Sequence, residues 1–467
     1  MRKLAGIVLC FALACLGAAE EWIGIFINGT KVGYARYSES NSTFEGKPAK
    51  LTESLTAMDL GMLGTPMKLN ILTRTWSAGG KLLAIEAKSD SAGRTQNTLA
   101  RFNGKKVDLT LNNSGEVTKR TIDVPTDLPV VDDALGAFLA MPNKKGASKS
   151  FYVLDPTTAS FIKNGVEWVG PTTVTVNGKE VTANKVLLKD PRADTTVFVS
   201  DSGEFVKAEA PMGIEMLPVT KEVALGKDEG KGGPVDLAES TKIVPTPPLK
   251  NPAKLRELAI EITGRDLSAV PSDKFQTVKV IENGAAITIH PPRATDMKNP
   301  PVSALRSLNT RYLKPSLHID SNHPRWKPIV KAATDGAKDF KTVVRRIHQY
   351  VFQRMKPNAG IGILRDAVEV YRSKEGVCRD YAILTGTLMR AAGIPTRVCS
   401  GLVSWDGSFY YHAWVEVYDG ANWYPIDSTS PDLQVSAAHV KLAHGNVEEA
   451  FTFPFLGKVQ VKVISQK

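Results

Sequence analysis

The spacing of hydrophobic positions divides this chain into a strand-rich first half and a later region of helices followed by strands. Over residues 20–225, short runs of β-branched and aromatic residues alternate with turn residues, which predicts an antiparallel β-rich domain. Asn-Gly at 28–29, 103–104 and 177–178 stands between strand-forming residues and favours tight hairpin turns. One short helix, at about 131–140, is expected to interrupt the strands.

The chain changes character between residues 226 and 320. Residues 226–254 are rich in Gly, Pro and Lys and show no sustained period, so they predict an interdomain linker. Strand-like runs such as ELAIEITG and AAITIHPP follow and indicate a small β module over 255–320.

Helical spacing begins beyond residue 320. Hydrophobic residues at helical intervals predict an amphipathic helix from about Phe340 that ends before Pro357, and a shorter helix is expected at about 363–372. A third helix is expected from Cys378 to about Ala392, because the Gly-Ile-Pro that follows is a typical stop signal.

Strand-like runs at 396–403, 410–418 and 423–427 complete this region. The order of helices first and an antiparallel sheet second predicts an α+β fold. We expect a core of helices packed on the sheet over 321–435, and a C-terminal extension over 436–467.

Residues 1–19 have the layout of a secretory signal peptide. Two basic residues precede an apolar run over 4–16, and small residues end the segment. A lipoprotein signal with Cys15 as the lipidated residue is less favoured, because alanine and not leucine stands three residues before it. No later segment has eighteen consecutive apolar residues, so we expect a secreted or periplasmic protein without an integral membrane segment after signal removal.

The net charge of the chain bears only on the expected class of partner. Lys and Arg number 59 against 48 Asp and Glu, which gives a formal net charge of +11 over 467 residues. The basic residues are not clustered in an arm or stripe, so the sequence does not favour nucleic acid as a partner. A basic surface attracted to anionic polymers of the cell envelope is the simpler interpretation.

Removal of the signal peptide would leave two cysteines, Cys378 and Cys399. A helix over 378–392 would separate its ends by about 20 Å, whereas a disulfide spans about 4.4–6.8 Å between Cα atoms. We therefore expect no disulfide between them and a buried, inert Cys399. Cys378 is a candidate nucleophile, because unpaired backbone N–H groups and the helix dipole stabilise a thiolate at a helix start.

The segment YYHAWVEVYDGANWYPID supplies a candidate base and a carboxylate. A two-residue Asp-Gly turn would pair Tyr418 with Ala421 and, counting outward, His412 with Asp427. Opposed residues share one face of a sheet, so the carboxylate would orient the imidazole and leave its other ring nitrogen to act as base. Each residue alone has a structural explanation, but together Cys378, His412 and Asp427 indicate a catalytic triad.

Other candidate residues have no such context. Gln353 projects from the helix face opposite the hydrophobic residues, so we expect it at the surface. The sequence contains no cysteine pair at zinc-ligand spacing, no phosphate-binding loop and no EF-hand loop, so it predicts no cofactor and no metal site. The remaining histidines are expected to be structural or exposed: His290, His318, His323, His348, His439 and His444.

The stretches GVCRDYAILTGTLMRAAGIPTRVCSGLV and YHAWVEVYDGANWYPIDST resemble the core of the transglutaminase-like superfamily, whose fold is related to that of papain-like cysteine proteases. The resemblance covers about residues 312–430. It implies Cys378 as nucleophile, His412 as base and Asp427 as orienting acid. Ser428 stands where the family often has proline.

The resemblance implies acyl transfer on a protein or peptide substrate. A thiolate attacks an amide carbonyl, an amine leaves, and a thioester waits for the second substrate. Water as acceptor makes the enzyme a peptidase or amidase, whereas a lysine-type amine makes it a crosslinking transglutaminase. Exported bacterial relatives are often hydrolytic, so we expect hydrolysis; a noncatalytic envelope scaffold, whose β-rich half binds a polymer or protein partner, is the alternative from another class.

Overall fold

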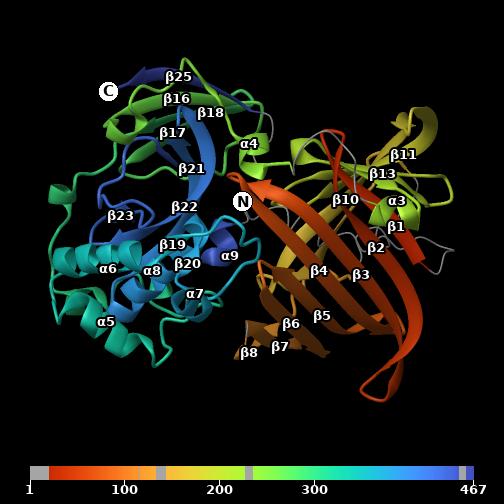
Figure 1. Cartoon of the computed structure of the whole chain (residues 1–467), viewed down its shortest axis with the longest axis horizontal. Coiled ribbons are helices and arrows are strands. Elements are labelled where there is room, and N and C mark those ends of the chain that lie inside the picture. Colours follow the sequence, from red (N-terminus) through yellow and green to blue (C-terminus); the bar gives the residue numbers. More distant parts are fainter. Residues whose placement is uncertain (1–19, 114, 133–143, 227–234, 452–458) are drawn as a thin grey trace. The chain divides into compact units, whose positions relative to one another are not determined.

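The computed structural model describes residues 20–113, 115–132, 144–226, 235–451 and 459–467. The predicted signal peptide, and all but the first two residues of the predicted helix at about 131–140, lie outside the described residues. The chain divides into two compact units (Figure 1). The first unit comprises the residues up to Ser240 together with Gly360–Leu364, and the second comprises Thr241–Ala359 and Arg365–Lys467.

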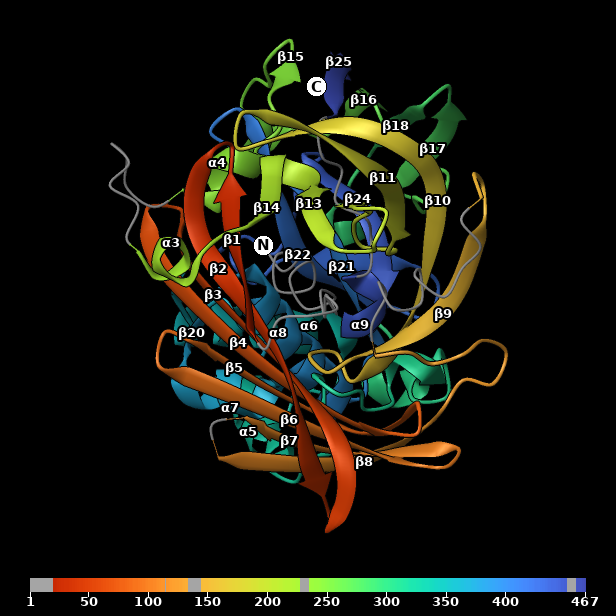
Figure 2. The same ribbon diagram turned by 90° about the vertical axis from the view of Figure 1, so that its right-hand side faces the viewer.

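The first unit is built on a 14-stranded antiparallel sheet (Figure 2). The sheet consists of two meanders, β1 to β8 and β9 to β14, which meet where β1 pairs with β14. The strands are β1 Glu20–Ile27, β2 Thr30–Phe44, β3 Lys47–Met62, β4 Thr65–Ala78, β5 Lys81–Ser91, β6 Arg94–Asn103, β7 Lys106–Asn113, β8 Glu116–Asp123, β9 Ser148–Asp155, β10 Ser160–Val176, β11 Lys179–Lys189, β12 Thr195–Val199, β13 Phe205–Ala210 and β14 Ile214–Pro218.

The three hairpins that Asn-Gly predicts are confirmed. At 28–29 and 177–178 both turn residues have positive φ, as a type I′ turn requires. At the third hairpin Asn103 still belongs to β6 and pairs with Lys106, so the turn consists of residues 104–105. Alternation of buried and exposed side chains along these strands is the pattern of a sheet with one face on a core.

The second unit contains two sheets, a short parallel pair and the principal helices. The strand orders are β23-β22-β21-β24, β15-β25-β16-β18-β17 and β19-β20. The strands are β15 Pro245–Thr246, β16 Leu258–Thr263, β17 Gln276–Ile281, β18 Gly284–Ile289, β19 Lys356–Pro357, β20 Glu375–Gly376, β21 Thr396–Trp405, β22 Ser408–Tyr418, β23 Trp423–Ile426, β24 His439–Gly445 and β25 Gln460–Gln466.

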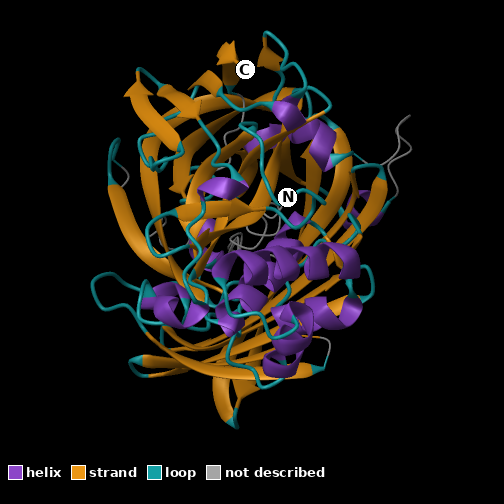
Figure 3. Cartoon of the chain, turned by 90° about the vertical axis from the view of Figure 1, so that its left-hand side faces the viewer, coloured by secondary structure: helices purple, strands orange, loops and turns teal. Residues whose placement is uncertain are grey.

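The described helices lie mainly in the second unit, and Figure 3 shows the longer ones grouped together. The α-helices are α3 Lys221–Leu225, α4 Leu237–Thr241, α5 Trp326–Thr334, α6 Phe340–Arg354, α7 Ala367–Ser373, α8 Cys378–Ala392 and α9 Val447–Ala450. Helix α8 packs against β21 and β22 and is surrounded by α5, α6 and α7. The predicted α+β class, with a β-rich region followed by helices on an antiparallel sheet, is confirmed.

The predicted bounds of α8 are confirmed at both ends. The helix starts at Cys378, and Gly393 ends it with φ of 99°, a left-handed conformation in which glycine is unstrained. Residues 379 to 390 are all buried, which makes α8 the central helix of the unit. A helix held on all sides gives its first residue a fixed position.

The C-terminal residues take part in both larger sheets of the second unit. Strand β24 pairs with β21, whereas β25 pairs with β15 and β16. The two sheets share one hydrophobic core, in which Ile260 and Leu402 are buried together with Val440. Within the described residues, no helix combines the length and the apolar character that crossing a membrane requires.

Candidate active site

Cys378 occupies the first turn of α8, and that turn is fixed by buried polar contacts. The Asp380 carboxylate accepts a hydrogen bond from the Val377 backbone N–H at 2.9 Å and another from Arg365 Nε at 3.3 Å. A Cβ atom on Gly376 would lie 2.5 Å from Cβ of Asp380, so only glycine fits at that point. The side chain of Cys378 is partly exposed at the end of this rigid turn.

His412 lies on β22 and pairs across the sheet with Gly401 of β21. A Cβ atom on Gly401 would lie 2.0 Å from the backbone oxygen of Val440, so glycine allows β24 to approach β21 at this level. The indole of Trp414 stacks beside His412, with ring centroids 6.3 Å apart and planes 23° from parallel. Trp414 thereby lies beside the imidazole on the same face of the sheet.

The predicted register of the β22–β23 hairpin is wrong by two residues. Tyr418 pairs with Trp423 and not with Ala421, so the connection has four residues instead of two. The reason is the buried side chain of Asp419, whose Oδ1 accepts hydrogen bonds from the backbone N–H groups of Ala421 and Asn422, both at 2.8 Å. These bonds stabilise a longer loop than a type I′ turn.

Asp427 nevertheless reaches His412. A shift of two residues leaves every side chain on the same face of the sheet, so the predicted contact survives the wrong register. Asp427 follows the end of β23, and its Oδ2 lies 2.8 Å from Nε2 of His412. Its backbone oxygen accepts a hydrogen bond from Nε2 of His348 at 3.2 Å, and the next residue, Ser428, accepts one from Thr385 on α8 at 2.9 Å.

His439, which the sequence indicated only as structural or exposed, is a second histidine on the same carboxylate. Its Nε2 lies 3.2 Å from Oδ2 of Asp427, and its ring meets Trp414 edge to face. Oδ1 of Asp427 accepts from the backbone N–H and the hydroxyl of Thr429, at 3.0 and 2.7 Å. No local motif points to His439, because only the pairing of β24 with β21 brings it here.

The electrostatics of the site favour a charged sulfur and a charged imidazole. Burial by itself raises the pKa of the Cys378 thiol, but the hydrogen bond and charge of His412 lower it below its ordinary value. Burial disfavours the imidazolium, yet the Asp427 carboxylate raises the pKa of His412 to about 10. The pKa of Asp427 stays well below its usual range despite burial, because both histidines stabilise the carboxylate. The arrangement therefore favours the thiolate–imidazolium form of the pair over the neutral form.

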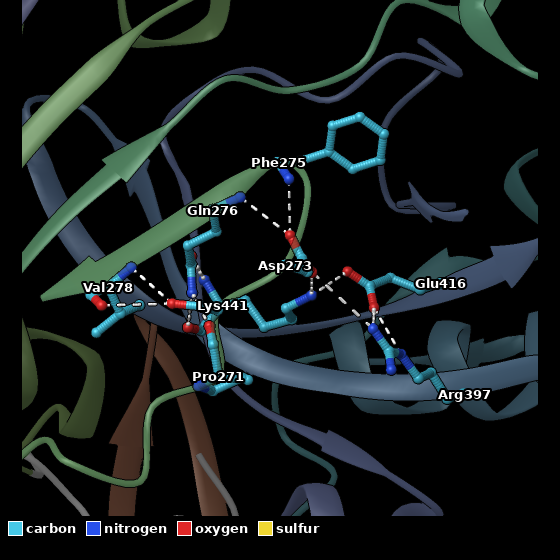
Figure 4. Close-up of polar contacts among 9 residues, drawn as sticks. Pro271, Asp273, Phe275, Gln276, Val278, Arg397, Glu416 and Lys441 are labelled. Carbon is cyan, nitrogen blue, oxygen red and sulfur yellow. Dashed lines mark hydrogen bonds and ion pairs between the residues drawn. The ribbon is translucent and has the colours of Figure 1, made fainter. Parts of the chain in front are cut away.

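A buried charged cluster lies further along β22 (Figure 4). Glu416 accepts from Lys441 Nζ at 2.6 Å and from Arg397 at 2.7 Å, and Lys441 also pairs with Asp273. Burial would raise the pKa of Glu416, but the two cations lower it to about 2. The side-chain amide of Gln276 bonds both backbone groups of Lys441.

A small pocket that is partly open to solvent connects this cluster with the histidine site. Trp414 and His439 line it together with Glu416 and Lys441, and apolar residues such as Phe275 complete its walls. A group bound there would lie against the Asp427-bound imidazole of His439.

The other expectations concern single residues. Cys378 and Cys399 are both free thiols, and Cys399 is fully buried, as expected. Burial raises the pKa of Cys399 well above its ordinary value, which makes it unreactive. Gln353 is exposed on α6, as predicted.

Two families match separate parts of the chain. Residues 327–428 match the family described as "Transglutaminase-like superfamily", and residues 23–219 match "Protein of unknown function (DUF3108)". The first match contains Cys378, His412 and Asp427, and the second falls within the 14-stranded sheet. None of the curated proteins matches the chain at a significant level.

Solved structures give weaker similarities. A candidate cysteine protease from Cytophaga hutchinsonii has 17% identity and a TM-score of 0.33, with 45% of this chain and 86% of that chain covered. A β-barrel-like protein of the DUF1849 domain family from Brucella abortus has 10% identity and a TM-score of 0.31, with 43% and 93% covered. A structure described as a TGase has 17% identity and a TM-score of 0.19, with 34% and 46% covered. Structural similarity this low carries no functional argument.

Proposed function

We propose, from the premise that residues 327–428 form a transglutaminase-like domain, that this chain is an exported cysteine-dependent enzyme that hydrolyses peptide or amide bonds. The observation that carries the proposal is the continuous contact from the Cys378 thiol through His412 to Asp427. Nucleophile, base and orienting acid are the three parts that covalent acyl transfer needs.

The first half of the proposed reaction forms a thioester. The Cys378 thiolate attacks the amide carbonyl carbon, and the carbonyl π electrons move to oxygen. As this tetrahedral intermediate collapses, the carbon–nitrogen bond breaks and the His412 imidazolium donates its proton to the leaving amine. Asp427 holds Nε2–H of His412, which directs the other ring nitrogen, Nδ1, to the sulfur.

The second half returns the enzyme to its starting state. Neutral His412 takes a proton from water, and the hydroxide attacks the thioester carbonyl. The carbon–sulfur bond then breaks, which releases a carboxylic acid and regenerates the thiolate beside the imidazolium. The Ala413 backbone N–H, which hydrogen-bonds the sulfur, stabilises the thiolate with which the cycle begins and ends.

We further propose where the protein is located and what its first unit does. A signal peptide over 1–19 would direct the protein to the periplasm or the exterior. The 14-stranded sheet would then bind an envelope polymer or protein and bring the substrate to the second unit. Protein or peptide is the substrate class that we propose.

The test uses the mature chain that begins at Glu20. Wild type, Cys378→Ala and the matched control Cys399→Ala are incubated with an envelope protein extract, and new amino termini and new crosslinks are both quantified by mass spectrometry. We expect new amino termini with wild type and Cys399→Ala and none with Cys378→Ala. Crosslinks without new amino termini would show that the enzyme is a transglutaminase and not a hydrolase. Undiminished activity of Cys378→Ala would contradict the thiol mechanism.

A further inference from the structure

The carboxylate of Asp427 is the centre of a three-residue group with the donor atoms of a metal site. Nε2 of His412 lies 2.8 Å and Nε2 of His439 lies 3.2 Å from the same oxygen, Oδ2 of Asp427. The three donor atoms all lie within 4.8 Å of one another. Among the residues that the structure describes, no other group of three His, Cys, Asp or Glu side chains meets at this distance.

The set of donors fits a specific class of ion. Two imidazoles and one carboxylate are ligands of Zn²⁺ and of neighbouring divalent transition metals, whereas Ca²⁺ and Mg²⁺ prefer oxygen ligands alone. A tetrahedral Zn²⁺ with bonds of about 2.0–2.2 Å separates its ligand atoms by about 3.3–3.6 Å. The 3.2 Å between Nε2 of His439 and Oδ2 of Asp427 is close to this range, whereas the 2.8 Å between Nε2 of His412 and Oδ2 would have to widen. The two imidazole nitrogens lie within 4.8 Å of each other, so side-chain rotations could bring the three donors to one ion.

The surroundings of the group favour binding that is accessible and reversible. The side chains of both histidines are 13% exposed and that of Asp427 is 6% exposed, so an ion can enter from the solvent side. Thr429 orients the carboxylate through Oδ1 and leaves Oδ2 for the ion. Nδ1 of His439 has no hydrogen-bond partner among the described residues, so its orientation is not supported as in a permanent site.

We propose that His412, Asp427 and His439 form an inhibitory site for Zn²⁺ or a related divalent transition metal. This inference rests on the proposed function, since it assigns a regulation to the same site. A bound ion would occupy Nε2 of His412 and Oδ2 of Asp427, and it would thus replace the hydrogen bond that orients the base. The imidazole could then no longer exchange a proton with Cys378 as catalysis requires.

The binding experiment does not depend on catalysis. Untagged mature protein carrying Cys378→Ala, which removes the sulfur as a ligand, is titrated with Co²⁺ by visible absorption and with Zn²⁺ by calorimetry. We expect one ion per chain. Adding His439→Gln or Asp427→Asn should weaken binding at least tenfold, while the matched control His290→Gln, which changes an exposed histidine outside the group, should leave it unchanged.

Inhibition is measured separately on the active protein. Zn²⁺ should abolish wild-type activity and EDTA should restore it, whereas the residual activity of His439→Gln should require at least tenfold more Zn²⁺ for half inhibition. Thermal melting shows whether each variant is folded. If one of the two ligand variants, His439→Gln or Asp427→Asn, fails to fold, the conclusion is drawn from the other. Binding that neither His439→Gln nor Asp427→Asn weakens would overturn the metal site, even if the amide-cleaving activity is found. Absence of activity with metal binding intact would instead overturn the proposed function.

Discussion

Replacing Asp427 with asparagine tests the orienting role by exchanging one carboxylate oxygen for an NH₂ group. The Thr429 backbone N–H and hydroxyl both donate to Oδ1, so the oxygen of an asparagine amide would remain on that side. Its NH₂ group would then face Nε2 of His412, where the native carboxylate accepts. A donor in that place favours the tautomer with the proton on Nδ1, and this tautomer cannot accept a proton from Cys378.

The expected magnitudes follow from these contacts. Loss of the correct tautomer and of the imidazolium's counter-charge reduces turnover about 10⁴-fold in a comparable triad. The amide keeps the shape and the Thr429 bonds, so we expect a loss of about 1–2 kcal/mol from the weakened histidine contacts. At about 2–4 °C per kcal/mol for a unit of this size, the melting temperature should fall by about 2–8 °C.

Two measurements separate these effects. The rate of Cys378 alkylation by iodoacetamide, followed by mass spectrometry at pH 6 to 10, requires no known substrate and reports the thiolate fraction. We expect slow alkylation of Asp427→Asn at neutral pH and recovery at high pH, together with loss of turnover. The control is Asp432→Asn, because Asp432 is exposed and lies beyond β23. Equal neutral-pH alkylation and turnover of Asp427→Asn and wild type would refute the orienting role.

Three further changes test other parts of the second unit. His412→Gln removes the group that lowers the pKa of Cys378, while burial still raises that pKa. The alkylation profile should therefore move to higher pH, and the rate at neutral pH should fall tenfold for each unit by which the Cys378 pKa rises. An unmoved profile would show that His412 does not stabilise the thiolate. Glu416 has a folded-state pKa of about 2 against an ordinary 4.5, so its stabilisation is complete above pH 4.5 and lost as the pH falls toward 2. Glu416→Gln should therefore lower the free energy of unfolding at neutral pH by about 3–5 kcal/mol. It should also make the melting temperature depend less on pH between those two values. A pH dependence equal to that of wild type would contradict this. Nonreducing mass mapping should find Cys378 and Cys399 unlinked, and a disulfide between them as the main form would contradict the assignment of Cys399 as inert.

Local signals predicted the helix and the candidate residues better than the pairing between them. The start of α8 at Cys378 and its end at Gly393 follow from residues adjacent in sequence, and the structure confirms both. The hairpin register does not follow from Asp-Gly alone, because the Asp419 side chain accepts two backbone amides and stabilises a longer loop. Side chains along a strand alternate between the two faces of the sheet, so a register error of two residues left His412 and Asp427 on the same face.

His439 could not be predicted, and the reason is the distance in sequence between pairing strands. The residue reaches Asp427 because β24 pairs with β21, and no turn chemistry connects those two strands. Helical and strand periods identify which residues share a face of one element. They do not identify which element is added at the edge of a sheet.

That edge has a consequence for self-association. β24 is the last strand of the four-stranded sheet, and an edge strand normally offers free N–H and C=O groups to strands of other molecules. At Lys441 both groups are already taken, because Gln276 Oε1 accepts from the backbone N–H at 2.8 Å and Gln276 Nε2 donates to the carbonyl at 2.7 Å. The glutamine amide thus takes the place of a peptide group from a neighbouring strand. At this position of the edge, a single buried side chain prevents a strand of another molecule from pairing with Lys441.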